Sequence, residues 1–249
     1  MLTSLRNIQQ LKHIIKINLM IELSNVTKKY SKDIVLDVLK LDIPEGQTFG
    51  LVGNNGAGKT TLFSCLLDLV KPTTGKITNN GIDVKQNEEW KKFTTAFLDE
   101  SFLIGYLLPE EYFYFIGELR GLRRKEIDDF LLKFEEFFNG EIIGKKKYLR
   151  DLSKGNQKKA GIVAALIGDP KVVVLDEPFA NLDPSTQIRL KQMIKELSSS
   201  GTTVLVSSHD LQDVTEVCKR IVLLEKGKVI NDINTSSKTL KELESYFKS

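Results

Sequence analysis

The stretch that decides the fold is Gly53-Asn-Asn-Gly-Ala-Gly-Lys59-Thr60. It matches the phosphate-loop pattern G-x-x-x-x-G-K-[ST] and lies between a β-branched run at residues 47–52 and an apolar stretch of helical character. Glycines let a backbone wrap around phosphate groups, so that its N–H groups and the start of the next helix point at negative charge. Because strand and helix flank the pattern, it predicts a nucleotide phosphate site.

Within such a loop the side chains have separate tasks. In this pattern the lysine, here Lys59, contacts the β- and γ-phosphates. The hydroxyl of the next residue, here Thr60, ligates a Mg²⁺ ion. The cofactors that follow from this prediction are ATP and Mg²⁺. The loop positions predicted to bind nucleotide are Gly53, Asn54, Asn55, Gly56, Ala57, Gly58, Lys59, Thr60 and Thr61.

Short β-branched runs recur along the chain, several of them separated by helix-like stretches. They lie at residues 47–52, 95–98, 172–175, 203–207 and 221–224. This alternation predicts a mainly parallel sheet covered by helices. The unbroken apolar run at 172–175 is typical of a strand buried on both faces.

Two adjacent carboxylates, Asp176 and Glu177, follow that apolar strand at the carboxyl edge of the sheet, where ligands of such folds gather. Neighbours in a strand point to opposite faces. One carboxylate is therefore expected to bind Mg²⁺ through its coordination shell, while the other binds the attacking water at the γ-phosphate. Such a pair alone is more often a solvated turn or a helix cap, but together with the phosphate loop it favours nucleotide hydrolysis.

Further motifs carry a resemblance to one family. The segment Leu152-Ser153-Lys154-Gly155-Asn156-Gln157 resembles the signature motif of ABC ATPases, usually written LSGGQ, with Lys and Asn in place of one Gly and the Gln. A Lys at that place also occurs in exporter-like members. The segment Asn181-Leu182-Asp183-Pro184 resembles the D-loop of the family, and Ser207-Ser208-His209-Asp210 resembles its switch histidine. The resemblance covers residues 20 to about 228.

The resemblance implies an α/β fold of the P-loop NTPase type, with a mainly parallel sheet, flanking helices, a small antiparallel β part and an inserted helical subdomain at about residues 100–155. It implies a dimer in which Ser153 and Gly155 of one subunit face the γ-phosphate held by the other. Glu177 would polarise the attacking water, His209 would donate a hydrogen bond to the γ-phosphate, and Tyr30 would stack on adenine. The catalytic residues of this interpretation are Glu177, His209 and Lys59.

The glutamine of the family's Q-loop is missing. By spacing, its place falls on Asp99 or Glu100, so the expected metal ligands are Thr60, Asp176 and one of these two acidic residues. An acidic residue there resembles the ABC-2 and the drug or antimicrobial-peptide export branches, which favours export.

The overall function predicted is the ATP-hydrolysing motor of a membrane transporter. Its expected partners are a separate transmembrane permease subunit and a second ATPase subunit, identical or related, and its expected location is the cytoplasmic face of the cell membrane. A soluble ABC ATPase that acts in iron–sulfur assembly or on ribosomes is the alternative. Transport is preferred because one ATPase region occupies the chain, whereas ribosome-acting members generally carry two.

Composition sets limits on these interpretations. The 249 residues suffice for one α/β domain at 20–249, preceded by a 1–19 extension in which Met20 is a possible true start. The net charge of +3 implies no strong field for nucleic acid, and no apolar run approaches the length of a membrane span. The two cysteines, Cys65 and Cys218, lack paired spacing and are expected to be buried structural thiols.

The region from about 100 to 150 is aromatic and charged, with an apolar stripe at helical spacing that fits either a helix core or a partner contact. The stripe consists of Ile127, Phe130, Leu131, Phe134, Phe137 and Phe138. Residues 107–108 and 112–115 lie where the family docks the coupling helix of its membrane subunit. The basic clusters at 145–147 and 158–159 are expected to be solvated faces rather than polyanion sites.

Overall fold

The computed structural model describes residues 18–236 and 239–248. The phosphate loop, the two adjacent carboxylates and His209 each follow a strand of the larger of the two sheets. Its strands are β3 (Thr48–Val52), β6 (Thr94–Phe97), β7 (Val172–Leu175), β8 (Thr203–Ser208), β9 (Arg220–Glu225) and β10 (Lys228–Asn234). In the order β10-β9-β3-β8-β7-β6, every neighbouring pair is parallel except β10 with β9. The prediction of a mainly parallel sheet is confirmed.

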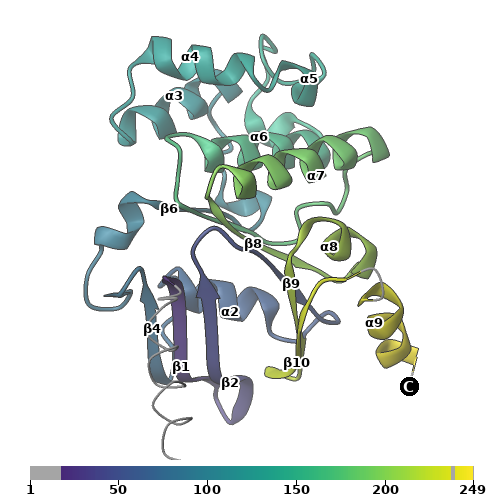
Figure 1. Cartoon of the computed structure of the whole chain (residues 1–249). Coiled ribbons are helices and arrows are strands. Elements are labelled where there is room, and N and C mark those ends of the chain that lie inside the picture. The colour runs from purple at the N-terminus through teal and green to yellow at the C-terminus, as the bar shows by residue number, and fades with distance from the viewer. Residues whose placement is uncertain (1–17, 237–238, 249) are drawn as a thin grey trace, which may run out of the picture.

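The smaller sheet is antiparallel, as expected, and has the order β2-β1-β4-β5. It consists of β1 (Leu19–Tyr30), β2 (Asp33–Pro44), β4 (Thr74–Asn79) and β5 (Ile82–Asp83). Figure 1 shows it at the lower end of the molecule, beside α2 (Lys59–Leu66). The extension at 1–19 lies outside the described residues except for its last two, and Leu19 already opens β1.

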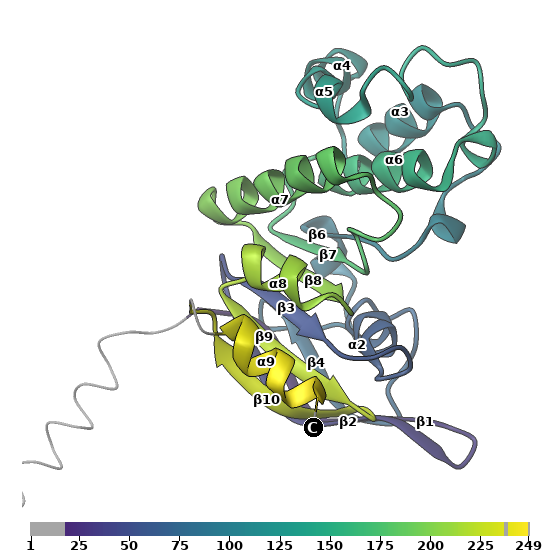
Figure 2. The ribbon, with the colours of Figure 1, turned by 90° about the vertical axis from the view of Figure 1, so that its right-hand side faces the viewer.

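The central strands are buried on both faces because their side chains alternate between two apolar cores. Val173 and Leu175 of β7 belong to one core, while Val172 and Val174 belong to the other. The first core packs under α6 (Lys154–Leu166), α7 (Pro184–Ser199) and α8 (Leu211–Val217), and the second packs against α2 and the antiparallel sheet. Figures 1 and 2 show the parallel sheet between these layers.

Helices fill most of the region expected to be an inserted subdomain, although its limits as a domain stay a prediction. They are α3 (Pro109–Leu119), α4 (Arg124–Leu132), α5 (Glu135–Phe138) and the 3-10 turn η3 (Leu149–Asp151). The aromatic stripe packs inward: four of its members are buried, and Phe130 and Phe134 are partly buried against the same core. These residues therefore form a helix core.

Three further elements complete the described part of the fold. They are the 3-10 turns η1 (Glu89–Lys92) and η2 (Glu100–Phe102) and the helix α9 (Thr239–Lys248), which contacts α8. Cys65 and Cys218 are free and buried, as expected, and burial raises the pKa of the Cys65 thiol to about 11. Among the described helices, none has the length and apolar character to cross a bilayer.

A candidate site for nucleotide binding and hydrolysis

The phosphate loop connects β3 to α2 and requires glycine at two positions. At Gly58 the backbone φ is 107°, a left-handed conformation that residues with a Cβ rarely adopt. At Gly53 an added Cβ would lie 2.3 Å from the carbonyl oxygen of Leu224 in β9. The tip of the loop, residues 54–56, is exposed. The loop is thus held tightly at both ends while its outer backbone is open to a ligand.

Lys59 opens α2, and its side chain is only 6% exposed. Its Nζ donates a hydrogen bond to the carbonyl oxygen of Gly53 at 2.6 Å and lies 3.2 Å from Oε1 of Glu177. A buried ammonium needs such partners because it has lost its water. The interaction brings together the loop and the strand-end carboxylate.

Asp176 is buried beside the start of α2. The Thr60 hydroxyl donates to its Oδ2 at 2.5 Å, and the Ser207 hydroxyl donates to its Oδ1. Burial raises the pKa of this carboxyl group, and the two hydroxyl hydrogen bonds oppose the shift. A hydroxyl and a carboxylate side by side are oxygen ligands of the kind that Mg²⁺ prefers.

The two carboxylates are separated by a turn rather than by strand alternation, which corrects the expectation. β7 ends at Leu175, and Glu177 has a left-handed backbone with φ 47°. Asp176 consequently contacts Thr60 and Ser207, whereas Glu177 points toward Lys59 and His209. The two acids still have distinct surroundings, as separate metal and water roles require.

Glu177 and His209 are in direct contact. Nδ1 of His209 lies 2.8 Å from Oε2 of Glu177, and the backbone N–H of His209 donates to the same oxygen at 3.3 Å. The other oxygen, Oε1, forms the ion pair with Lys59 but accepts no hydrogen bond although it is buried. An unsatisfied buried carboxylate oxygen fits a site that receives a water, because such an atom gains a partner when the water arrives.

The structure separates the two candidates for the Q-loop place. Asp99 is exposed, and its Oδ1 accepts from the backbone N–H of Ser101, which makes it the cap of its own turn η2. The Glu100 side chain is 16% exposed and lies 3.8 Å from Lys158 Nζ. Oε1 of Glu100 is buried without a hydrogen-bond partner. Only Glu100 is therefore connected to the group around Glu177.

The expectation that residues 158–159 form a solvated face is wrong. Lys158 and Lys159 are 5% and 4% exposed. They lie in the part of α6 that is buried at every position, residues 157–166, and their amino groups reach carboxylates: Lys158 meets Glu100, and Lys159 meets Glu141 at 3.1 Å. The sequence pattern missed this because adjacent lysines usually indicate solvent.

Ser207 is a second residue whose role the sequence reasoning missed. Its hydroxyl donates to Asp176 and accepts the backbone N–H of Glu177 at 2.9 Å. It lies near the end of β8, the parallel neighbour of β7. The shared carboxyl edge of two parallel strands was the signal that could have identified it.

The signature segment forms the start of α6. Ser153 caps the helix, its Oγ accepting the backbone N–H of Asn156 at 3.2 Å. Gly155 packs against the D-loop, because an added Cβ would lie 3.0 Å from the carbonyl oxygen of Asn181. Asp183 then caps α7 by accepting a hydrogen bond from the backbone N–H of Thr186. The hydroxyls of Ser185 and Thr186 also donate to its carboxylate, and together these hydrogen bonds hold the pKa of Asp183 low.

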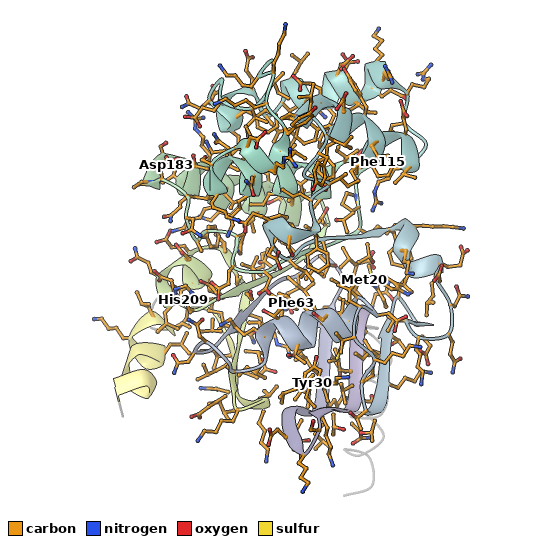
Figure 3. The ribbon with its side chains drawn as sticks, turned by 180° about the vertical axis from the view of Figure 1, so that it is seen from behind. Met20, Tyr30, Phe63, Phe115, Asp183 and His209 are labelled. Atoms are coloured by element: carbon orange, nitrogen blue, oxygen red, sulfur yellow. The ribbon has the colours of Figure 1, made fainter. Side chains whose placement is uncertain are left out.

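Tyr30 ends β1 and is 49% exposed, with the Lys28 ammonium 4.8 Å from the centre of its ring. In Figure 3 Tyr30 lies toward the lower end of the molecule, while His209 and Asp183 lie along one side of it. No contact joins Tyr30 to the carboxylates. An exposed ring is free to stack on a base, and its role toward adenine stays a prediction.

Comparison with known proteins agrees with this geometry. The model of the ABC transporter family matches residues 36–180. The uncharacterized ABC transporter ATP-binding protein YhaQ of Bacillus subtilis is 36% identical over 85% of this chain and 70% of its own. The bacitracin transport ATP-binding protein BcrA of Enterococcus faecalis is 31% identical over 87% of this chain and 70% of its own.

Among solved structures, a dimeric ATP-binding cassette in a post-hydrolysis state with ADP and phosphate is 25% identical, with a TM-score of 0.79 over 88% of this chain and all of that one. The chain belongs to the ABC transporter family and is an ATP-binding ATPase subunit of that family. The α/β fold of P-loop NTPases inferred from the motifs is confirmed.

Proposed function

We propose that this chain is one of two ATPase subunits that close around two MgATP and drive a separate transmembrane subunit, in the direction of export. The observation that carries the proposal is the cluster in which Lys59, Thr60, Asp176, Glu177 and His209 converge on the end of the phosphate loop. This arrangement matches the needs of phosphoryl transfer to water.

In the proposed reaction the chain's residues position charge and accept a proton. The loop N–H groups and Lys59 bind the β- and γ-phosphates. Glu177 accepts a hydrogen bond from the attacking water and receives its proton as the water oxygen bonds to the γ-phosphorus and the bond to the ADP oxygen breaks. His209 orients Glu177 and reaches the γ-phosphate. Mg²⁺, held by Thr60 and Asp176, would neutralise the charge that develops on the phosphates.

The signature segment supports a dimer. It lies at an N-terminal helix end, where free backbone N–H groups attract an anion, but no contact joins Ser153 or Gly155 to the phosphate loop of the same chain. A second copy, placed head to tail, would bring its own γ-phosphate to this helix end. The dimeric relative makes the same arrangement reasonable for this chain.

A pocket of about 410 Å³ next to η2 is the proposed docking place for the membrane partner. Phe102, Leu103 and Ile116 are among its lining residues, and Phe102 is 57% exposed. This refines the surface expected from the sequence, because Phe113 is fully buried and does not face a partner. Figure 3 shows Phe115 on the other side of the helical region from Asp183.

Export and a position on the cytoplasmic face of the membrane are the finer parts of the proposal. Export rests on the acidic Glu100 at the Q-loop place, which resembles the export branches, and on a 30% identical relative, the Nod factor export ATP-binding protein I of Cupriavidus metallidurans. The transmembrane subunit would determine both the membrane position and the direction of transport. The decisive experiment therefore identifies that subunit.

The test captures the tagged chain from gently solubilised native membranes and identifies what comes with it. We expect an integral membrane protein, and we expect Phe102→Glu to lose it while the ATPase activity of the isolated chain is kept. Leu39→Glu, at a site on β2 that is 77% exposed, is the matched control and should retain the partner. Capture of soluble proteins alone, or equal loss with both variants, would contradict the proposal.

A further inference from the structure

Lys158 is a buried charge beside the site that the proposed function leaves unused. Its Nζ donates a hydrogen bond to the carbonyl oxygen of Glu177 at 2.8 Å, and the Glu100 carboxylate lies 3.8 Å away. We infer that Lys158 is a positioning residue: it holds the backbone of Glu177 and is held in turn by Glu100, so that the Q-loop place is joined to the water-activating residue within one chain. The inference rests on the proposed role of Glu177.

Glu177 needs such support because of its backbone. Its φ of 47° lies in the left-handed region, which a residue with a Cβ occupies only where its surroundings hold it there. Three hydrogen bonds hold its backbone, and the longest is the one that the Glu177 carbonyl accepts from the backbone N–H of Ala180 at 3.4 Å. The Glu177 N–H donates to Ser207 Oγ at 2.9 Å, and the Glu177 carbonyl accepts from Lys158. Removing Lys158 leaves the carbonyl with only the longer bond from Ala180, so that side of the residue is held less firmly and the carboxylate can shift with it.

Lys158 in turn needs Glu100. Its side chain is almost entirely buried, and burial lowers its pKa while the nearby carboxylates of Glu100, Glu177 and Asp176 oppose the shift. Oε1 of Glu100 is buried and accepts no hydrogen bond. A buried ammonium and a buried carboxylate that face each other compensate each other's charge. Removing one of them would leave the other buried without a counter-charge.

The next residue provides a natural comparison. Lys159 has the same charge, the same helix and a similar burial, yet its Nζ pairs with Glu141 instead of reaching the carboxylates of the site. Lys159→Met therefore removes a buried, paired ammonium without touching Glu177. Any effect of Lys158→Met that Lys159→Met lacks is an effect on the site rather than on the helix.

The experiment measures kcat, KM and MgATP affinity of the full chain for four variants: K158M, K159M, E100Q and K158M/E100Q. We expect K158M to lower kcat by about 10- to 100-fold, the range for losing a charged hydrogen bond, with KM and affinity nearly unchanged. K159M should reduce thermal stability and leave kcat within about threefold of the parent, as for residues outside the chemistry. The double variant should lose less than the product of the two single losses, because the partners act together.

The inference is overturned if K158M and K159M reduce kcat equally, if K158M raises KM alone, or if the double variant is simply multiplicative. Should K158M fail to fold, K158R decides the question, since it keeps the charge and the donor: activity close to the parent supports the inference, and activity no better than that of E177Q contradicts it. E177Q also separates the two proposals. A fully active E177Q removes the role of Glu177, whereas an inactive E177Q beside a normal K158M removes only the inference.

Discussion

The phosphate-loop half of the site and the signature half differ in how far one chain completes them. In the first half, Lys59, Asp176 and Glu177 are each held by partners from other strands and helices. In the second, Ser153 holds only the start of its own helix. One half is organised before any ligand binds, and the other presents free N–H groups that a second subunit's nucleotide can use. The comparison predicts that substitutions in the first half act on an isolated chain and those in the second act on the dimer.

Glu177→Gln should have the largest effect. The amide keeps the shape of the side chain but cannot accept the proton of the attacking water, so we expect turnover to fall by about 10²- to 10⁴-fold, the range for general bases. MgATP affinity should be retained, and ATP should produce a stable dimer. ATPase assays and size-exclusion chromatography with ATP measure both. Unchanged steady-state hydrolysis would remove Glu177 from its role.

Lys59→Ala should come next and act on nucleotide binding itself. Loss of a charged hydrogen bond to phosphate corresponds to about a 10- to 100-fold weaker affinity. Isothermal titration calorimetry with MgATP measures it on the isolated chain, and Lys85→Ala, at an exposed position of the same charge, serves as the control. Tight MgATP binding by the Lys59 variant would contradict the phosphate-loop assignment.

Ser153→Ala sharpens the comparison because it lies in the other half. The lost cap should cost about 1 kcal/mol of stability, measured by thermal unfolding. We expect MgATP to bind the monomer normally, while an E177Q/S153A double variant should form the ATP-dependent dimer less readily than E177Q alone. If monomer affinity falls instead, the signature segment contacts nucleotide within its own chain and the two halves are not separate.

Tyr30→Leu should have the smallest effect. Replacing an aromatic ring by an aliphatic side chain removes stacking but leaves apolar contact, so ATP affinity should weaken by about 2- to 12-fold, which is the scale of an aromatic pair. Inorganic tripolyphosphate lacks a base and should bind the parent and the variant equally. Equal losses for both ligands would show that Tyr30 supports the loop rather than the adenine.

The elements with strong local signals could be predicted from the sequence. The run at 172–175 is apolar at every position and forms the interior strand β7, and the glycine pattern at 53–60 forms the turn between β3 and α2 and the first residues of α2. Asp176 and Glu177 were assigned to one edge because parallel strands end together. Their separation by a left-handed turn at Glu177 was not predicted, because adjacent letters do not reveal a backbone dihedral angle.

Long-range contacts were the part that sequence patterns missed. Lys158 and Lys159 looked like a solvated pair, and both are buried because other parts of the fold surround α6 at every position from 157 to 166. Spacing left Asp99 and Glu100 equivalent at the Q-loop place. The surroundings of the two residues differ because Asp99 caps the turn η2, whereas the side chain of Glu100 points toward Lys158.

The sequence by itself indicated the family, five strands of the parallel sheet and the residues of the phosphate loop, because these depend on local pattern and spacing. Only the tertiary structure decided which polar groups meet: Lys59 meets Glu177, Lys158 meets Glu100, and the Ser207 hydroxyl bonds both the Asp176 carboxylate and the Glu177 N–H. Charges inside a protein are stabilised by partners that lie far away in the chain, and folding alone brings those partners within reach.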